Sequence, residues 1–187
     1  MAPLRRFTID AQASRLTAHA FASGLVKAVL HNPKFAVRNF AGEVDFSGAS
    51  LTRAKVKLAI QTTSLALLDE VSVRDYEEIR RVTQEEVLEG ELFPEILFES
   101  SEIKATKISK NLYNASITGN LSLHGRTQVQ VIECQVVASK ESVRAIGHFN
   151  VRQTDFGIKI TSIAGNTLKM EDEVKIGFFI LAQKASS

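Results

Sequence analysis

The chain has 187 residues, of which 44% are hydrophobic, and its 23 Lys and Arg against 21 Asp and Glu give a formal charge of +2. This length is typical of one domain with a sizeable core, and the hydrophobic fraction excludes a disordered chain. The small net charge argues against a nucleic-acid-binding protein, which usually carries a strong basic bias. The aromatic residues are 11 Phe, 2 Tyr and no Trp, so we expect most aromatic rings in a core or an apolar binding site.

The N-terminal segment MAPLRRFTID places two arginines directly before an alternating segment. No apolar run of roughly 7–15 residues follows them, as a secretory signal would require, and no segment approaches the roughly 18 apolar residues of a membrane span. The single cysteine, Cys134, cannot form an intrachain disulfide, which fits a reducing compartment. The sequence therefore predicts a cytoplasmic protein without a membrane span. A periplasmic or secreted protein whose signal peptide has been removed is the alternative.

The first half of the chain contains strand candidates in which apolar residues tend to alternate with polar ones. These candidates are segments 14–22, 34–47 and 55–60. In the second of them the apolar phase shifts by one residue between Val37 and Phe40, which predicts a β-bulge near Arg38–Asn39. Residues 23–32 have the pattern of a short helical turn, about 24–31, which begins after Ser23 and ends before Pro33.

Residues 66–90 interrupt the strand pattern and predict one longer helix, about 68–89. Apolar residues recur there at steps of three to five: Leu68, Val71, Tyr76, Ile79, Val82 and Val87. Gly90 follows the last apolar turn, as is typical of a helix C-terminus. We expect this helix to cover one mouth or one face of the sheet, with its charged side in water.

Long alternating strands dominate the second half of the chain, in segments 95–103, 111–123, 126–137, 142–152 and 173–183. A shift of phase near Val131–Ile132 predicts a second bulge, and residues 178–181 are apolar on both faces. About eight antiparallel strands result, which is a number that can close a barrel with room for one small ligand. An open sandwich is the competing architecture.

No metal-binding or catalytic motif is present in the sequence. The four histidines, His19, His31, His124 and His148, are far apart, and none belongs to an HxxH or HExxH arrangement. Cys134 lies in an apolar strand segment, which favours an inert packed thiol over a nucleophile. We therefore expect a protein that is not an enzyme and that holds no metal.

Three segments interrupt the alternation: FPEILFESSEI at 93–103, GNLSLHGRTQVQV at 119–131 and RQTDFGIKI at 152–160. The residues alone favour structural roles for them, as a strand start at Pro94, a tight hairpin turn at His124–Gly125 and a bend at 155–157. An enzyme would instead need a polar cluster inside a cavity, such as His124 with Asp155 or Glu99.

The same three segments resemble motifs of the YceI-like family of lipid-binding proteins. The family's (Y/F)PxIxFxS strand start is matched by Phe93, Pro94, Ile96, Phe98 and Ser100. Its GxLTLHGxT hairpin is matched by Gly119, Leu121, Leu123, His124, Gly125 and Thr127, with Ser122 in place of a threonine, and its DFGI motif by residues 155–158. The order and spacing hold from about residue 7 to residue 183. The chain departs from the family where most members read D-x-x-H-S, because Ala13–Ser14 stand at the His–Ser positions, and segment 23–33 is longer than usual.

The resemblance implies a mainly all-β fold over residues 1–187, an extended eight-stranded antiparallel barrel similar to lipocalins, with a helix packed against it. It also implies that a long isoprenoid or fatty-acyl-type lipid occupies an apolar tunnel. Such a protein would bind, transport or store its ligand, and would need no cofactor apart from that lipid. The alternatives are an enzyme that acts on an apolar substrate in the same cavity, and a structural or interaction module with a filled barrel.

The candidate ligand-binding residues lie on the apolar faces of the strands and at the motif corners. The predicted lining is Phe35, Val37, Phe40, Phe98, Leu121, Leu123, Phe149 and Val151, with Phe93 and Phe156 near the ends. An anionic head group would meet His31, Arg126 or Arg144. We also expect Gly119 and Gly147, on two inward faces, to leave volume for a ligand, although glycine in strands also marks bulges. The apolar residues 178–181 suit either the core or a homodimer contact.

Overall fold

The computed structural model describes residues 4–23, 32–47, 50–160, 162–163 and 168–184. Its strands are β1 (Arg5–Ile9), β2 (Arg15–Ser23), β3 (Lys34–Val37), β4 (Phe40–Phe46), β5 (Lys55–Gln61), β6 (Leu65–Leu67), β7 (Glu95–Ser109), β8 (Leu112–Leu123), β9 (Arg126–Ala138), β10 (Ser142–Arg152), β11 (Ser162–Ile163) and β12 (Leu168–Lys184). Its helical segments are the 3₁₀ turns η1 (Leu51–Arg53), η2 (Thr62–Ser64) and η4 (Gln153–Phe156), the α-helix α1 (Val73–Arg81) and the π-helical η3 (Val82–Val87).

Eight antiparallel strands form a closed barrel, in the order β1–β4–β5–β7–β8–β9–β10–β12. The ring closes because β12 also pairs with β1, with Ile9 opposite Ala182 and Phe7 opposite Lys184. The predicted eight-stranded barrel is therefore confirmed, and the open sandwich is excluded.

Three of the eight strand positions in the barrel are each occupied by two successive shorter strands. Strands β1 and β2 both pair with the same edge of β12, one after the other. Strand β4 pairs with β1, and β3 pairs with β2. In the next position β5 pairs with β4, and β6 pairs with β3. The predicted irregularity at Arg38–Asn39 is present, as a break between β3 and β4 rather than a bulge within one strand. The Arg38 N–H donates to the Ser64 carbonyl (3.0 Å), and the Gln61 N–H donates to the Asn39 carbonyl (3.0 Å). The break between β3 and β4 is therefore bonded to the neighbouring break between β5 and β6.

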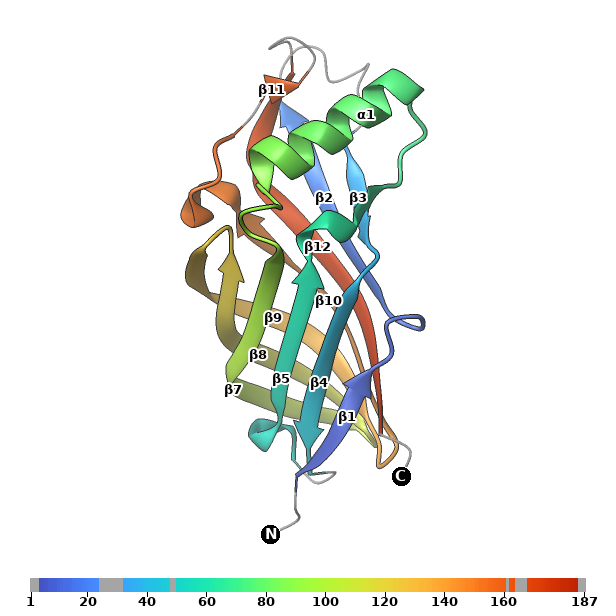
Figure 1. Ribbon diagram of the computed structural model, residues 1–187. Helices are drawn as coiled ribbons and strands as arrows, with labels where there is room; N and C mark the ends of the chain where they lie inside the picture. The colour runs from blue at the N-terminus through green and yellow to red at the C-terminus, as the bar shows by residue number, and fades with distance from the viewer. Residues whose placement is uncertain (1–3, 24–31, 48–49, 161, 164–167, 185–187) are drawn as a thin grey trace.

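The barrel opens toward one end because β6 does not continue the pairing between β5 and β7. The β5–β7 ladder ends with Gln61 opposite Glu95, and the chain between β6 and β7 carries α1 and η3 over the opening. Figure 1 shows α1 across this end of the barrel, opposite the end where β1 begins and β12 ends. None of the helices in the described ranges has the length and apolar character needed to cross a membrane.

The predicted helix over 68–89 begins later than expected. The Leu68 N–H donates to the Lys34 carbonyl (2.8 Å), which prolongs the β3–β6 ladder, and the Asp69 carboxylate accepts from the Lys34 N–H (2.6 Å). The helix starts only after Ser72, whose hydroxyl accepts from the Asp75 N–H (3.1 Å) as an N-cap. The predicted helical turn at 24–31 lies outside the described residues.

The second predicted bulge, near Val131–Ile132, is wrong. The β8–β9 register is unbroken from Leu112 opposite Val137 to Leu123 opposite Arg126. Val129 and Val131 are apolar but 69% and 49% exposed, because they lie on the outer face, whereas Ile132 is buried. The register shifts elsewhere, between Ser100 and Glu102 and between Lys107 and Ser109 in β7, and between Met170 and Val174 in β12.

A well-packed core lies where β1, β4 and β12 meet. Phe7 is 1% exposed, its ring centroid lies 6.1 Å from that of Phe46, and Ala182 on β12 is fully buried. These side chains belong to one cluster with Leu51 of η1 and Val143 of β10. The cluster therefore joins the two strands whose pairing closes the ring.

We expect the substitution Phe7→Ala to lower the free energy of unfolding by about 3–5 kcal/mol, because it removes a fully buried ring and leaves a cavity. Urea unfolding followed by circular dichroism measures this change. The control is Leu97→Ala, which truncates an exposed side chain on the outer face of β7 and should cost less than about 1 kcal/mol. Equal losses for the two variants would contradict the assignment of Phe7 to the closure core.

Candidate ligand-binding site

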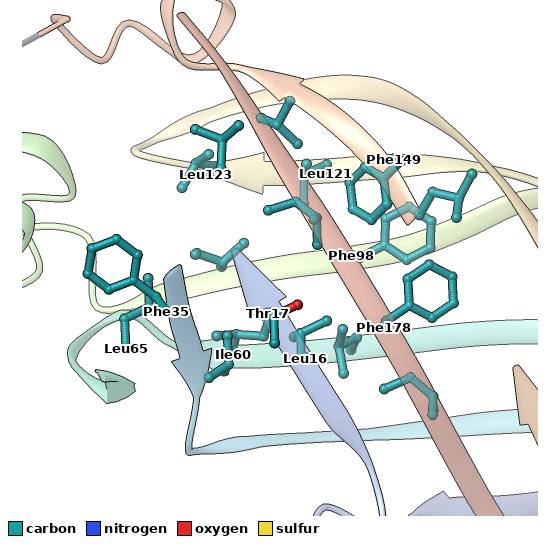
Figure 2. Close-up of a pocket in the computed structure, with 18 of the residues that line it drawn as sticks. Leu16, Thr17, Phe35, Ile60, Leu65, Phe98, Leu121, Leu123, Phe149 and Phe178 are labelled. Atoms are coloured by element: carbon teal, nitrogen blue, oxygen red, sulfur yellow. The ribbon is translucent and has the colours of Figure 1, made fainter. Parts of the chain in front are cut away.

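The barrel encloses a cavity of about 300 Å³. All eight barrel strands contribute side chains to its wall. On the side of α1 and η3, the wall is formed by Ile79, Val82, Thr83, Val87 and Leu88. Figure 2 shows the rings of Phe98, Phe149 and Phe178 gathered in one part of this wall, with Phe35 and Leu65 in another part. The interior is therefore hollow among the described residues, rather than filled by side chains.

The wall of the cavity is almost entirely apolar. Its polar members are Thr17, Thr83 and Gln153, and no described residue in the wall carries a charge. The Thr17 hydroxyl donates to the Gly177 carbonyl (3.3 Å), and the Gln153 amide donates to the Glu171 carbonyl (2.9 Å). Such a wall favours the hydrocarbon part of a ligand, because an ion buried there would find no partner among these residues.

Seven predicted lining residues do face the cavity: Phe35, Val37, Phe98, Leu121, Leu123, Phe149 and Val151. Phe40 is buried in the core cluster of the barrel instead. Phe93 and Phe156 lie at a corner of the rim that is described below. Arg126 and Arg144 are exposed, and His31 lies outside the described residues. Whether any of these residues binds a ligand stays a prediction.

The cavity wall also contains residues that the predicted lining does not include. Val56, Leu58 and Ile60 of β5 alternate like the predicted lining strands, and the apolar stripe of the helix segment contains Ile79, Val82 and Val87. Both signals are visible in the sequence. Because a helix can cover a sheet without facing a cavity, only the structure assigns these side chains to the wall.

The two inward glycines do not leave room for a ligand in the way the sequence indicated. A Cβ atom on Gly119 would lie 2.6 Å from Cζ of Phe98, and one on Gly147 would lie 2.9 Å from Cζ of Phe178. The space above each glycine is therefore occupied by a phenyl ring. These glycines let the two rings lie close to the sheet.

The DFGI segment fills a second place where neighbouring strands separate. Strands β9 and β10 pair from Ala138 opposite Val143 to Cys134 opposite Gly147, and then diverge. The η4 turn lies beside β9 there, because the Gln128 amide donates to the Asp155 carbonyl (2.9 Å). The buried side chains of Phe156 and Ile158 pack in one cluster with Ile132 and Val151. The predicted bend therefore places apolar side chains in the gap between β9 and β10, and we call this segment the η4 plug.

His124 connects this plug to the end of the helical segment. The hairpin turn at His124–Gly125 has positive φ at both residues (52° and 71°), as in a type I′ turn. The imidazole Nδ1 lies 3.3 Å from the Phe156 carbonyl oxygen, and Nε2 contacts the Glu89 carboxylate. The Phe93 ring lies 4.5 Å from the imidazole, between ring centroids. The three sequence segments singled out above therefore meet at one corner of the rim.

The polar cluster that an enzyme would need is not formed by the predicted residues. His124 contacts Glu89 and the Phe156 carbonyl rather than the Asp155 side chain. Glu99 lies on the outer surface, where its carboxylate pairs with Lys57 (3.2 Å). Within the described ranges, no three His, Cys, Asp or Glu side chains come together as metal ligands would.

Burial, followed by the nearby Glu133 carboxylate, raises the pKa of the Cys134 thiol to about 11. Both effects disfavour the thiolate, which is the reactive form of the side chain. This agrees with an inert packed thiol.

Comparisons with known proteins place the chain in a structural context. Residues 7–182 match the family model described as YceI-like domain. A search of curated proteins found no match. The structure is similar to that of BcnA from Burkholderia cenocepacia (TM-score 0.71, 20% identity, covering 94% of this chain and 99% of that one).

Two further solved structures have the same fold. One is described as a polyisoprenoid-binding domain from Saccharophagus degradans implicated in plant cell wall breakdown (TM-score 0.67, 14% identity, covering 96% of this chain and 98% of that one). The other is a YCEI protein of Campylobacter jejuni (TM-score 0.65, 18% identity, covering 88% and 92%). At these identities the similarity shows the shared fold.

We expect Cys134 to react slowly with a thiol reagent such as DTNB in the folded protein. With a pKa of about 11 instead of the ordinary 9.0, its thiolate fraction at pH 8 is about a hundredfold lower. The rate in native buffer, compared with that in unfolding concentrations of urea, measures the difference. A native rate within tenfold of the unfolded rate would contradict the burial of this thiol.

Proposed function

Because the chain belongs to the YceI-like family, we propose that it binds a long-chain apolar amphiphile, of isoprenoid or fatty-acyl type, inside its barrel. The observation that carries this proposal is the hollow interior with its uncharged, almost entirely apolar wall. The polyisoprenoid-binding description of the Saccharophagus degradans domain supports the isoprenoid class. The proposed role is transport or storage by a single domain, without catalysis.

The tail of the ligand would supply most of the affinity. Burial of apolar area stabilises a complex by roughly 25 cal/mol per Å², before the costs of association are subtracted. Such burial discriminates weakly between tails of similar length and width. We therefore expect a class of ligands rather than one compound, and the small net charge of +2 fits a partner that is not recognised by long-range electrostatic attraction.

The head group would lie toward the helical end of the barrel. Thr83 of η3 and Gln153 of η4 add polar atoms to the wall, and both belong to the segments that cover the openings between strands. The arginines nominated for an anionic head group, Arg126 and Arg144, have exposed side chains. The support is thus stronger for an uncharged polar head than for a carboxylate or phosphate within the described part of the cavity.

A homodimer and a cytoplasmic location stay predictions. Ile146 is exposed on the outer face of β10 and lies opposite Phe179 of β12, which belongs to the apolar segment 178–181. This outer face is where a second copy would bind. Light scattering during gel filtration tests the assembly state, and fractionation of the native cell tests the location.

The direct test of the proposed function is to identify what the purified protein carries. Native mass spectrometry reports the mass of any bound molecule, and organic extraction followed by mass spectrometry identifies it. We expect a lipid with a long hydrocarbon chain, in a protein-to-lipid ratio near one. Protein that carries no lipid and that takes up neither isoprenoid alcohols nor fatty acids in solution would contradict the proposal.

We expect the substitution Ala145→Phe to weaken binding of the fluorescent apolar probe N-phenyl-1-naphthylamine at least tenfold, which is about 1.4 kcal/mol. Ala145 lies in the cavity wall on β10, so the added ring would occupy ligand volume. Fluorescence titration measures the dissociation constant. The matched control is Ala41→Phe, which places the same ring at an exposed position of β4 and should leave binding unchanged. Equal binding by both variants would contradict the assigned cavity.

A further inference from the structure

The segment that covers the cavity is attached differently at its two ends. We call residues 73–89, which form α1, η3, Leu88 and Glu89, the lid. On the β6 side, the chain leading into the lid is held by the bonds between Lys34 and residues 68–69 described above.

On the β7 side, the chain is anchored, within the described ranges, only from Phe93–Pro94 onward, where the Thr62 hydroxyl donates to the Phe93 carbonyl (3.0 Å) and the Thr62 N–H donates to the Pro94 carbonyl (2.9 Å). The lid end before this anchor is attached to the barrel by side-chain contacts: the Gln84 amide donates to the Thr62 carbonyl (3.0 Å), and Glu89 contacts His124.

The β7-side end of the lid shows features of a segment that is held in place by its contacts. Its last turns are π-helical, a wide and rare geometry that is frequent at functional sites. Glu89 has φ of +45°, in the left-handed region that costs a non-glycine residue of this kind some strain. The Gln84 carbonyl oxygen Oε1 is buried without a hydrogen-bond partner. The strained φ and the unpaired acceptor each lower the cost of moving this end away from the barrel, because strain and a buried unpaired group are both relieved by opening.

The Glu89–His124 contact is suited to hold this end closed. Nδ1 of His124 faces the Phe156 carbonyl, which can only accept, so Nδ1 carries a hydrogen atom. Nε2 faces the Glu89 carboxylate, and this contact is attractive only when a further proton lies between the two groups. The contact is therefore a hydrogen bond between the end of the lid and an imidazole that also donates to the Phe156 carbonyl. It joins the lid to both the β8–β9 hairpin and the η4 plug.

We propose that Glu89 and His124 form the latch of the lid, and that the cavity exchanges its ligand when this latch opens and residues 82–89 move away from the barrel. The proposal rests on the proposed function and concerns how that cavity is reached. The side chains of Val82, Thr83, Val87 and Leu88 line the cavity. Movement of this end of the lid would therefore uncover the wall directly, while the β6-side end stays anchored.

The test compares dissociation of N-phenyl-1-naphthylamine from the full-length protein and three variants by stopped-flow fluorescence. Glu89→Ala removes the latch from a side chain that is 38% exposed, so little packing is lost. We expect dissociation about tenfold faster, since removing one partner of a buried hydrogen bond leaves the other unsatisfied and shifts an equilibrium by about that factor. Glu89→Gln can still donate to a neutral imidazole and should remain within about threefold of the parent protein.

The matched control is Glu77→Ala, which makes the same change in the same lid and breaks only the exposed Glu77–Arg80 ion pair (2.9 Å). We expect it to leave the dissociation rate unchanged. If Glu89→Ala dissociates no faster than the parent protein, or if Glu77→Ala accelerates dissociation equally, the latch is wrong.

Hydrogen exchange gives a readout that needs no ligand. Loss of the latch should speed exchange of the Leu88 and Gly90 amides, which donate to the Thr83 and Gln84 carbonyls at the end of the lid, and leave the β8–β9 ladder unchanged. If the parent protein binds no probe, the proposed function fails while this measurement still decides the latch. Unchanged exchange at these two amides in Glu89→Ala would overturn the latch.

Discussion

The antiparallel pairing of β1 with β12 is the constraint on which the rest of the structure depends. The contact is short, from Phe7 opposite Lys184 to Ile9 opposite Ala182, yet it converts an open sheet into a ring without free edges at this end. All inner faces then point toward one axis, where the Phe7 and Phe46 rings pack. Because the inner side chains do not fill the remaining length, closure also creates the cavity.

The same ring opens toward the other end at two places, and each opening is covered by a segment that departs from strand geometry. Residues 73–88 cover the opening beside β6, and η4 fills the gap between β9 and β10. Residues 73–88 add apolar side chains to the cavity wall, and Phe156 of η4 packs in the adjoining core cluster. His124 contacts the Glu89 carboxylate, directly after the first cover, and the Phe156 carbonyl of the second. One imidazole at a tight hairpin turn therefore ties together segments that are far apart in the sequence, which gives the three motifs a common physical role.

The candidate site was predictable where it follows from the alternation of apolar and polar residues along a strand. Phe98, Leu121 and Phe149 face the cavity because every second residue of a strand lies on the same face. The same reasoning was misleading at Val131, where apolar residues occupy the outer face, and at Gly119 and Gly147, whose space is taken by rings from other strands. Contacts between paired strands decide the two glycines, and the burial of each face of the barrel decides Val131. The pattern within a single strand carries no information about either.

By itself, the sequence determined the all-β character, the number of barrel strands, an irregularity at Arg38–Asn39 and most of the apolar inner face, because side-chain alternation and turn chemistry are local properties. Only the tertiary structure decided that β1 closes on β12, that Ile79 and Val82 of the lid complete the cavity wall, and that His124 contacts Glu89. The physical reason is that these contacts join residues 35 or more positions apart. Their geometry is set by strand register and ring closure, which no short segment encodes.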